Sequence, residues 1–371
     1  MPVRHALYAF GSNDEGELGL TPCKIVDTPT FVRQFDDIKT IRGGGNHTVA
    51  LGNLGSVWGA GQNSKDQLGA GGLQNNRLVA FTKLRQDVFT CAATSDTTAF
   101  VDGKTWQLHT YGIDQFGELG CAENLSSFAF PRPVVDFVAG HWHYVAVLDN
   151  GDVWGWGRNR YGQLGLSATE GSEVVPPAQY STPTKIGGIP FSVTRAICGK
   201  EFTYLVGDSA TGEHKILGRD QHKLISSMPD HVRGWKDIGA TWHAIFVLFE
   251  DGTLHGWGKV NQWKLIPPGL PRIAQIAVGT EHILAVTNDE RLLSWGWGFH
   301  GNCGDLKGLE GIKPSGVVSG LWNEIKGIEG KIVKVAAGYA TSFVVAETQQ
   351  ETATFVHEEL SQEDEPAENA R

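Results

Sequence analysis

The chain has 371 residues, a formal net charge of -10 at pH 7, 40% hydrophobic residues and 48 glycines. It has no run of about 18 apolar residues, which excludes a membrane-spanning helix, and we expect no signal peptide because no apolar segment follows Met1. The five cysteines are far apart, without a Cys-x-x-Cys spacing. This favours free thiols in a reducing compartment over a disulfide framework or a zinc site.

The negative charge is concentrated at the C-terminal end. Residues 347–371 carry eight acidic side chains against one arginine, which is -7 of the total -10. High charge with few apolar residues is typical of disordered segments. We therefore expect one folded domain over 1–346 and an acidic, disordered tail over 347–371. Since no basic arm or stripe is present, we expect no direct binding of nucleic acid.

A first short motif recurs along the chain. It consists of a small residue, two variable residues and usually a histidine, followed by an apolar strand. The clearest copies start at Gly44, Gly140, Ala240 and Gly279, and weaker copies start at Ala93, Gly199 and Gly338.

A second motif follows each first motif at a nearly constant distance. It is an apolar or aromatic residue, a glycine, a polar loop and a closing Leu-Gly, with the first glycine at positions 11, 61, 112, 157, 218, 258 and 298. The intervals between the motifs are 17, 19, 17, 19, 18 and 19 residues. This constancy indicates a hairpin of fixed length, and Asn150-Gly151 and Asp251-Gly252 are typical of its tight turns.

The recurrence of both motifs determines the expected fold, because internal repeats of this length indicate stacked supersecondary units. The chain opens on a second motif at Gly11 and closes on a first motif at Gly338, so its two ends complete the seventh unit. Such closure leaves only short, protected sheet edges. We predict an all-β, seven-bladed β-propeller, closed by pairing of the N- and C-terminal strands in one blade.

The repeat also accounts for residues that could be mistaken for a site. His47, His143, His243 and His282 share one phase of the first motif. We expect each to hydrogen-bond within its own blade, because a metal requires three or four ligands in one shell. The aromatic residues of the second motif are expected to pack between blades; they are Phe10, Tyr111, Trp156, Trp257 and Trp297. No P-loop or nucleophile elbow is present, so we expect no enzyme activity, catalytic residue, metal or cofactor.

A few aromatic residues have no role in the repeat. Trp142 and Trp242 occupy variable positions of the first motif, Trp263 occupies a loop position that is often glycine, and the last second-motif loop is two residues shorter than its counterparts. Antiparallel strands bring all of these loops to one face, and tryptophan is enriched at interface hot spots. The alternative is that each residue covers a local apolar gap. The predicted partner-binding residues are Trp142, Trp242, Trp263, Phe299, His300 and Asn302.

The repeating unit, a strand, Asp-Gly, a strand and Trp-Gly-x-Asn-x-x-Gly-x-Leu-Gly, resembles the repeat of the regulator of chromosome condensation family over about residues 5–346. The match is closest from Val153 to Leu166. Three stretches further resemble one fungal branch of this family. They are Tyr8 to Asn13, Gly44 to Val49 and, above all, Trp295 to Gly304 with its shortened loop.

That resemblance implies a non-enzymatic partner protein. Members of this branch form a heterodimer with a small CSL-type zinc-binding protein, through which they support Elongator-dependent modification of tRNA wobble uridines and diphthamide synthesis on translation elongation factor two. A cytoplasmic and nuclear location goes with this role.

Two other activities of the family are alternatives. The first is guanine-nucleotide exchange on a Ran-like small GTPase, against which we weigh the missing basic arm and the short repeats near 218–240 and 258–279. The second is ultraviolet reception, which requires Trp interleaved with Arg, whereas Trp142 and Trp242 are each followed by histidine.

Overall fold

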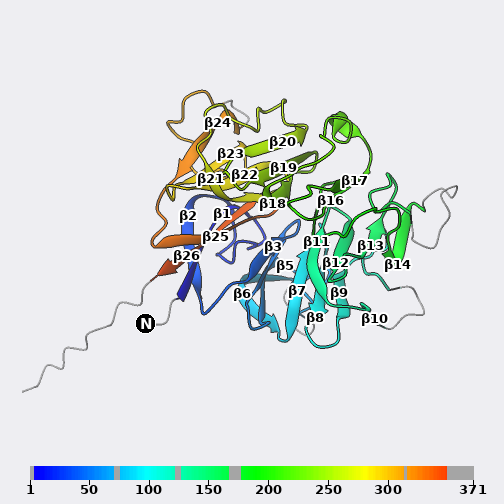
Figure 1. Cartoon of the computed structure of the whole chain (residues 1–371). Coiled ribbons are helices and arrows are strands. Elements are labelled where there is room, and N and C mark those ends of the chain that lie inside the picture. The colour runs from blue at the N-terminus through cyan, green and yellow to red at the C-terminus, as the bar shows by residue number, and fades with distance from the viewer. Residues whose placement is uncertain (1–3, 71–75, 122–126, 167–176, 313–315, 349–371) are drawn as a thin grey trace, which may run out of the picture.

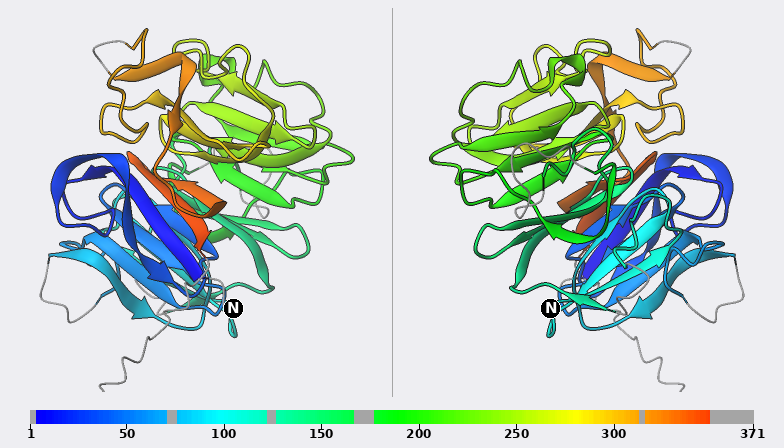
Figure 2. Two further views of the ribbon diagram at one scale, coloured as in Figure 1. Left: turned by 90° about the vertical axis from the view of Figure 1, so that its left-hand side faces the viewer. Right: turned by 90° about the vertical axis from the view of Figure 1, so that its right-hand side faces the viewer.

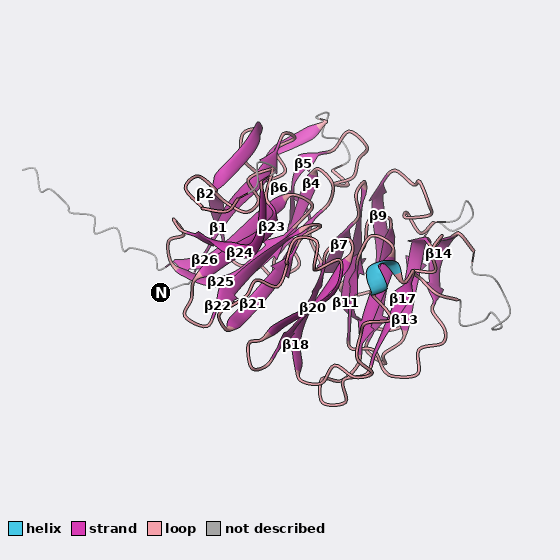
Figure 3. Cartoon of the chain, turned by 90° about the horizontal axis from the view of Figure 1, so that it is seen from above, coloured by secondary structure: helices cyan, strands magenta, loops and turns pink. Residues whose placement is uncertain are grey.

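A computed structural model describes residues 4–70, 76–121, 127–166, 177–312 and 316–348, which form seven antiparallel sheets (Figure 1). Figure 3 shows the chain from above, with η1 (Gln221–Lys223) as the one helix of the described ranges. Within those ranges, no helix has the length and apolar character needed to cross a membrane. The predicted all-β, seven-bladed propeller is confirmed.

The blades are numbered from the sheet that holds both ends of the described chain, and their strands are given from the centre outward. Blade 1 contains β25 (Lys331–Ala337), β26 (Thr341–Thr348), β1 (Arg4–Asn13) and β2 (Cys23–Phe35). Blade 2 contains β3 (Thr40–Gly43), β4 (His47–Leu51), β5 (Val57–Gln62) and β6 (Arg77–Arg85). Blade 3 contains β7 (Val88–Ala93), β8 (Thr97–Asp102), β9 (Gln107–Gly112) and β10 (Phe128–Ala129).

The remaining blades continue in chain order. Blade 4 contains β11 (Val134–Ala139), β12 (His143–Leu148), β13 (Val153–Arg158) and β14 (Gln179–Lys185). Blade 5 contains β15 (Arg195–Cys198), β16 (Phe202–Val206) and β17 (His214–Gly218), and blade 6 contains β18 (Trp235–Ala240), β19 (Ala244–Phe249) and β20 (Leu254–Gly258). Blade 7 contains β21 (Ile273–Val278), β22 (His282–Thr287), β23 (Leu292–Trp297) and β24 (Val317–Ile325).

The ring closes as predicted. β1 pairs antiparallel with β26, from Arg4 opposite Thr348 to Gly11 opposite Thr341, and Figure 2 shows the blue and red strands side by side from both directions. β26 runs to Thr348, two residues beyond the expected domain boundary at 346. The other residues of the predicted acidic tail, 349–371, lie outside the described part.

The core lies between neighbouring blades. The second strand of each blade is covered on both faces, and β12, with the sequence HYVAVL, is buried at every position. Trp156 is fully buried and its indole Nε1 donates to the carbonyl oxygen of Glu118 in blade 3 at 2.9 Å. Such large buried rings contribute much of the apolar area that drives folding. All five cysteines are free, as predicted.

The strand register corrects the sequence alignment of the last repeat. In blade 4 His143 pairs with Gly157, and in blade 7 His282 pairs with Gly296, so Gly296 rather than Gly298 is the second-motif glycine. The φ angles agree, since Gly157 has 95° and Gly296 has 103°. The segment Trp295-Gly296-Trp297-Gly298 contains two Trp-Gly pairs, and only strand pairing decides between them.

The last loop is therefore not shortened, and that prediction was wrong. Gly301 and Gly304 follow Gly296 at the same spacings at which Gly162 and Gly165 follow Gly157, and all of them have positive φ. Trp295 is the residue that packs between blades: it is fully buried and donates from Nε1 to Leu265 O at 2.7 Å. Trp297, which was predicted to have this role, is only partly buried.

Candidate protein-interaction site

Both kinds of motif loop lie on one face of the ring, which we call the motif face. Arg158 in the second-motif loop of blade 4 donates its backbone N–H to the carbonyl oxygen of Trp142 in the first-motif loop at 2.8 Å. Trp297 donates in the same way to Glu281 in blade 7, also at 2.8 Å. The hairpin turns lie at the opposite end of the strands, on what we call the turn face.

Backbone hydrogen bonds join the first-motif loops of successive blades around the centre of the ring. They run from Gly45 N to Ser95 O, from Ser95 N to His141 O, from Lys200 N to Trp242 O, from Trp242 N to Thr280 O and from Thr280 N to Gly338 O. These bonds fix the loops in place, so a partner that binds here does not have to order them. Such preorganisation lowers the entropic cost of association.

Three first-motif histidines link neighbouring blades. The Nε2 atom of His47 lies 2.8 Å from Thr98 Oγ1, and the Nε2 atom of His143 lies 3.0 Å from Thr203 Oγ1, each in the next blade. His282 makes the same contact with Ser342. The predicted hydrogen bonds within a single blade were therefore wrong. Burial lowers the pKa of His47 and His282 to about 4 and that of His143 to about 3, so these side chains are neutral at pH 7.

His243 differs from the other three histidines. In blade 6 it is Ala244, not His243, that pairs with the second-motif glycine Gly258, so the histidine lies one residue out of phase. It is only partly buried, and its ring centroid lies 5.7 Å from that of His222. Burial lowers its pKa to about 4, with Lys259 adding to the effect. His243 therefore contributes to the motif face as a neutral imidazole at pH 7.

An aromatic cluster covers the centre of the motif face, and we call it the mouth cluster. It consists of His141, Trp242 and Tyr339, with ring centroids 5.3 Å apart for His141 and Trp242 and 5.9 Å apart for Trp242 and Tyr339. The Tyr339 hydroxyl lies 3.3 Å from His141 Nδ1. The Lys200 ammonium lies 4.8 Å from the Trp242 ring centroid. Trp242 is thus held by three blades besides its own.

Trp142 lies next to the mouth cluster, towards the rim. Its ring contacts that of Phe116 at 5.5 Å, and the Arg158 guanidinium lies 4.6 Å from its centroid. An arginine stacked on an aromatic ring is attracted to the negative face of the π system. This pairing leaves donors of Arg158 available at the same surface, because no ion pair joins that residue to a carboxylate in the described structure.

The remaining predicted residues lie in blades 6 and 7. Trp263 is partly buried, and the Lys259 ammonium lies 5.4 Å from its ring centroid. Phe299 is 53% exposed and stacks on Trp297 with a centroid distance of 6.2 Å and an interplanar angle of 16°. His300 lies against Trp297 at 4.9 Å. Trp297, Lys200 and Lys259 were missed in the sequence. The doubled Trp-Gly was the available signal for Trp297, and the nearby Trp263 was the signal for Lys259, whereas Lys200 lies far from Trp242 in the sequence.

Asn302 does not reach the surface. It is fully buried, and its side-chain amide donates to the carbonyl oxygen of Trp297 at 2.7 Å. Its backbone oxygen accepts a hydrogen bond from Ser342 Oγ at 2.7 Å. We therefore leave Asn302 out of the surface. The other five predicted residues lie on the motif face, where they follow an arc from blade 4 to blade 7.

Metal chemistry has no support from the described ranges, in which no group of three or more His, Cys, Asp or Glu side chains is placed to hold an ion.

Two models of the regulator of chromosome condensation (RCC1) repeat match the chain, one at residues 4–51 and 150–206 and the other at 134–163 and 273–302. Over these residues the chain is similar to RCC1 repeats.

Curated proteins are similar to this chain over most of its length. The chain is 26% identical to an RCC1 repeat-containing protein of Schizosaccharomyces pombe, over 92% of this chain and 99% of that protein. It is also 26% identical to the ultraviolet-B receptor of Arabidopsis thaliana, over 80% of this chain and 74% of the receptor. The secretion-regulating guanine nucleotide exchange factor of Mus musculus is again 26% identical, over 81% of this chain and 75% of that protein.

Solved structures show the same fold. Human WBSCR16 superimposes with a TM-score of 0.73 at 18% identity, covering 92% of this chain and all of that one. Yeast RCC1 (Prp20), in a crystal structure with Kap60, gives a TM-score of 0.72 at 18% identity, covering 94% of this chain and 90% of that one. At these identities the likeness concerns the fold alone.

Proposed function

We propose that this protein is a non-enzymatic interaction module and that its motif face binds a small CSL-type zinc-binding protein. We further propose that it is the counterpart of the fungal alpha-tubulin suppressor, also known as killer-toxin-insensitivity protein thirteen. Through the heterodimer it would support Elongator-dependent tRNA modification and diphthamide synthesis, in the cytoplasm and the nucleus. The stretches from Tyr8 to Asn13 and from Gly44 to Val49 resemble that protein but are typical of the repeat in general, and the loop before Gly304 no longer supports this identity by its length.

The observation that carries the proposal is the arc of paired aromatic and cationic side chains on the motif face. It runs from Trp142 with Arg158, through Trp242 with Lys200 and Trp263 with Lys259, to Phe299. Aromatic residues and arginine are enriched in the cores of protein interfaces. Their loops are already held by backbone hydrogen bonds, so their burial against a partner is not offset by a large loss of loop entropy.

The test is co-expression of the full chain with the small zinc protein, followed by size-exclusion chromatography with light scattering. A one-to-one complex that persists at micromolar concentration is the expected result. Separate elution of the two proteins at that concentration would count against the proposed partner. A pull-down with the same bait then asks whether Elongator subunits or diphthamide-synthesis enzymes accompany the pair.

Guanine-nucleotide exchange on a Ran-like small GTPase is the second candidate function. It is favoured by the similarity to the murine secretion-regulating exchange factor and to the regulator of chromosome condensation of Xenopus laevis, which is 25% identical over 78% of this chain. The assay follows release of a fluorescent guanine nucleotide from the GTPase. We expect no acceleration, and a clear acceleration would reverse the order of the two functions.

A further inference from the structure

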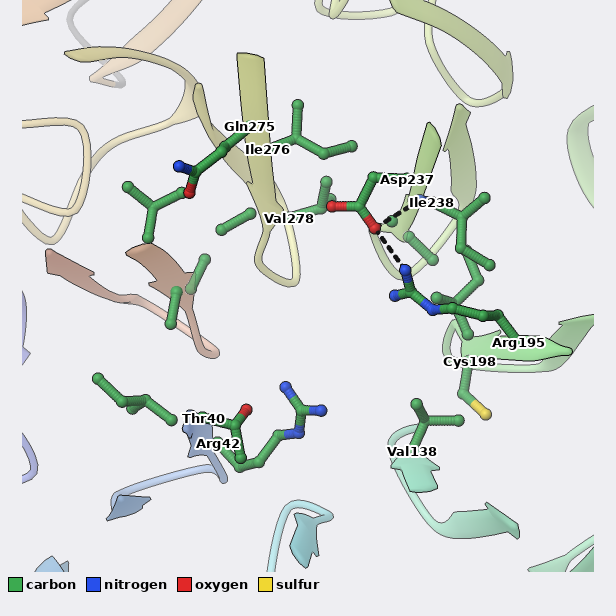
Figure 4. A pocket seen from close by; sticks show the side chains of 18 of the residues that line it. Thr40, Arg42, Val138, Arg195, Cys198, Asp237, Ile238, Gln275, Ile276 and Val278 are labelled. Carbon is green, nitrogen blue, oxygen red and sulfur yellow. Dashed lines mark hydrogen bonds and ion pairs between the residues drawn. The ribbon is translucent and has the colours of Figure 1, made fainter. Parts of the chain in front are cut away.

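The central channel of the propeller has a polar lining that the repeat does not require. The innermost strands of the blades enclose a cavity of about 570 Å³. Along these strands, alternate side chains turn into the blades and into the channel: Ile41 and Ile238 are buried in the blades, whereas Arg42 and Asp237 face the cavity in Figure 4. Four cations and two carboxylates line the cavity, namely Arg42, Arg195, Lys236, Lys334, Asp136 and Asp237.

One wall of the channel, formed by blades 4 to 6, is internally neutralised. Arg195 lies between two carboxylates, with its Nη1 2.9 Å from Asp237 Oδ1 and its Nε 3.8 Å from Asp136 Oδ2. Figure 4 shows the contact with Asp237 as a dashed line. Asp136 also accepts the backbone N–H of Ala196 at 2.9 Å. Both carboxylates of the cavity are therefore occupied by Arg195 and by backbone donors.

The opposite wall, formed by blades 1 and 2, is cationic and has no such partner. Lys334 Nζ donates to the carbonyl oxygen of Lys39 at 2.6 Å, and Lys39 Nζ donates to that of Phe89 at 2.7 Å. The Nε atom of Arg42 is shielded from solvent and makes no hydrogen bond. Among the described residues, none of these three cations forms an ion pair with a carboxylate.

This arrangement is unfavourable without an anion. Burial lowers the pKa of Lys334, and the charges of Arg42 and Lys39 lower it further, so both cations lie close to the Lys334 ammonium. Desolvated like charges destabilise a fold unless a counter-charge is present. Nor does the repeat demand an arginine, because the same register position in the other innermost strands is apolar or small: Ala92, Val138, Ile197, Gly239, Ala277 and Ala336.

We propose that Arg42 and Lys334, which line the cavity, and Lys39, whose carbonyl oxygen accepts the hydrogen bond of Lys334, form a binding site for the phosphate group of a small molecule. A doubly charged oxyanion matches a guanidinium fork with two ammonium groups, and charge-assisted hydrogen bonds of this kind are the strong ones. Towards the motif face the channel narrows to a space of about 110 Å³ beneath Trp242 and Tyr339. The ligand therefore enters from the turn face.

The test measures binding of inorganic phosphate and of ADP to the full chain by calorimetry and by the phosphate dependence of the melting temperature, in low-salt buffer. Arg42→Met keeps the side-chain length and removes the charge, and Lys236→Met removes one charge from the neutralised side of the same cavity. We expect Arg42→Met to weaken binding about tenfold or more, as is typical when a charged hydrogen-bond partner is lost. Lys236→Met should leave the affinity within about twofold.

A second readout separates binding from a structural role. In phosphate-free buffer Arg42→Met should melt at or above the temperature of the unaltered chain, because an unpaired shielded cation has been removed; if it does not fold, Lys334→Met serves in its place. Tighter binding of ADP than of phosphate would identify a phosphate ester as the ligand, and equal or weaker binding would identify the free anion. The proposal is overturned if neither probe binds at millimolar concentration, if sodium chloride at equal ionic strength gives the same response, or if the Arg42 and Lys334 variants both bind phosphate normally.

Discussion

The Nε2 atom of His143 in blade 4 lies 3.0 Å from the hydroxyl oxygen of Thr203 in blade 5. The relationship recurs around the ring. At these two positions of neighbouring blades, one in each blade, the side chains are either both polar or both apolar. Thr97 meets the Tyr144 hydroxyl at 2.7 Å, whereas Ala244 in blade 6 and Ile283 in blade 7 occupy the same two positions without polar atoms. Four of the polar pairs are thus hydrogen-bonded, as a buried site favours, whereas the hydroxyls of Thr341 and Thr48 at the same positions of blades 1 and 2 are buried without a hydrogen-bond partner among the described residues.

Removal of one such contact should destabilise the ring. We expect His143→Ala to lower the free energy of unfolding by about 3 kcal/mol, because it creates a cavity and leaves the Thr203 hydroxyl with only its contact to Cys198 Sγ, a weak hydrogen-bonding group. His243→Ala is the matched control and should change it by less than about 0.5 kcal/mol, since that side chain is partly exposed and has no hydroxyl partner. Urea unfolding followed by tryptophan fluorescence measures both. Equal losses in the two variants would contradict the role of the interblade bond.

The same histidines predict acid sensitivity. The pKa values of His47, His143 and His282 in the folded chain are about 4, 3 and 4, below the ordinary value of about 6.5. Between the folded pKa of each histidine and pH about 6.5, the unfolded chain binds a proton that the folded chain does not. The free energy of unfolding therefore rises with pH over this range. Their stabilising contribution is complete above pH about 6.5 and is lost progressively towards pH about 4, by up to about 1.4 kcal/mol per pH unit for each histidine. Urea midpoints at pH 7, 6 and 5 measure this loss, and a smaller loss is expected in His143→Gln.

Glu118 offers a prediction with the opposite sign. Its side chain accepts the backbone N–H groups of Gln115 and Phe116, and burial raises its pKa to about 7. Because the folded pKa lies above the unfolded one, its contribution weakens as pH rises from about 4.5 through about 7. In the second-motif loop of blade 4, the neutral side chain of Gln163 accepts the same kind of hydrogen bond, from the backbone N–H of Tyr161. We expect Glu118→Gln to stabilise the chain by about 1 kcal/mol at pH 8 and by less at pH 5.

The reciprocal change provides the control for this prediction. Gln163→Glu should lose stability at pH 8 relative to pH 5, because it introduces a carboxylate at an equally buried position. Thermal melts of both variants at the two pH values give the comparison. A pH-independent effect in Glu118→Gln would rule out the buried charge as its cause.

The corrected register of blade 7 can be checked with glycine substitutions. A Cβ on Gly296 would lie 2.5 Å from the carbonyl oxygen of Glu281, at a φ of +103°, whereas one on Gly162, at +77°, would meet nothing within 4 Å. We expect Gly162→Ala to reduce the free energy of unfolding by about 1 kcal/mol, from backbone strain alone. Gly296→Ala should reduce it by more than about 3 kcal/mol, because the backbone must shift as well. Similar losses measured by urea unfolding would contradict this assignment.

The proposed motif face predicts how partner affinity responds to mutation. Trp242→Ala, Trp263→Ala and Phe299→Ala should each weaken binding of the small zinc protein by about 2 kcal/mol, a typical hot-spot loss. Phe31→Ala is the matched control, since Phe31 is 49% exposed on the outer strand β2, close to the 53% of Phe299. Calorimetric titration with circular dichroism as a folding check separates affinity from stability. Normal affinity in all three variants would place the interface elsewhere.

The repeat pattern alone was sufficient to predict the architecture. Seven paired motifs, Asp-Gly and Asn-Gly turns and the offset ends of the chain predicted seven blades and their closure. This succeeds because turn chemistry and strand alternation are local properties, and each blade can satisfy them with its own residues. The pairing of β1 with β26 follows from those local rules once the ring is complete.

The contacts between neighbouring blades were decided only by the tertiary structure. The sequence could not choose between Gly296 and Gly298, because both follow a tryptophan and only strand register distinguishes them. It also could not show that His143 bonds across blades, that Asn302 is buried, or that Arg42 and Lys334 share one wall of the channel. Those facts depend on contacts between residues tens or hundreds of positions apart, and such contacts exist only after the ring has closed.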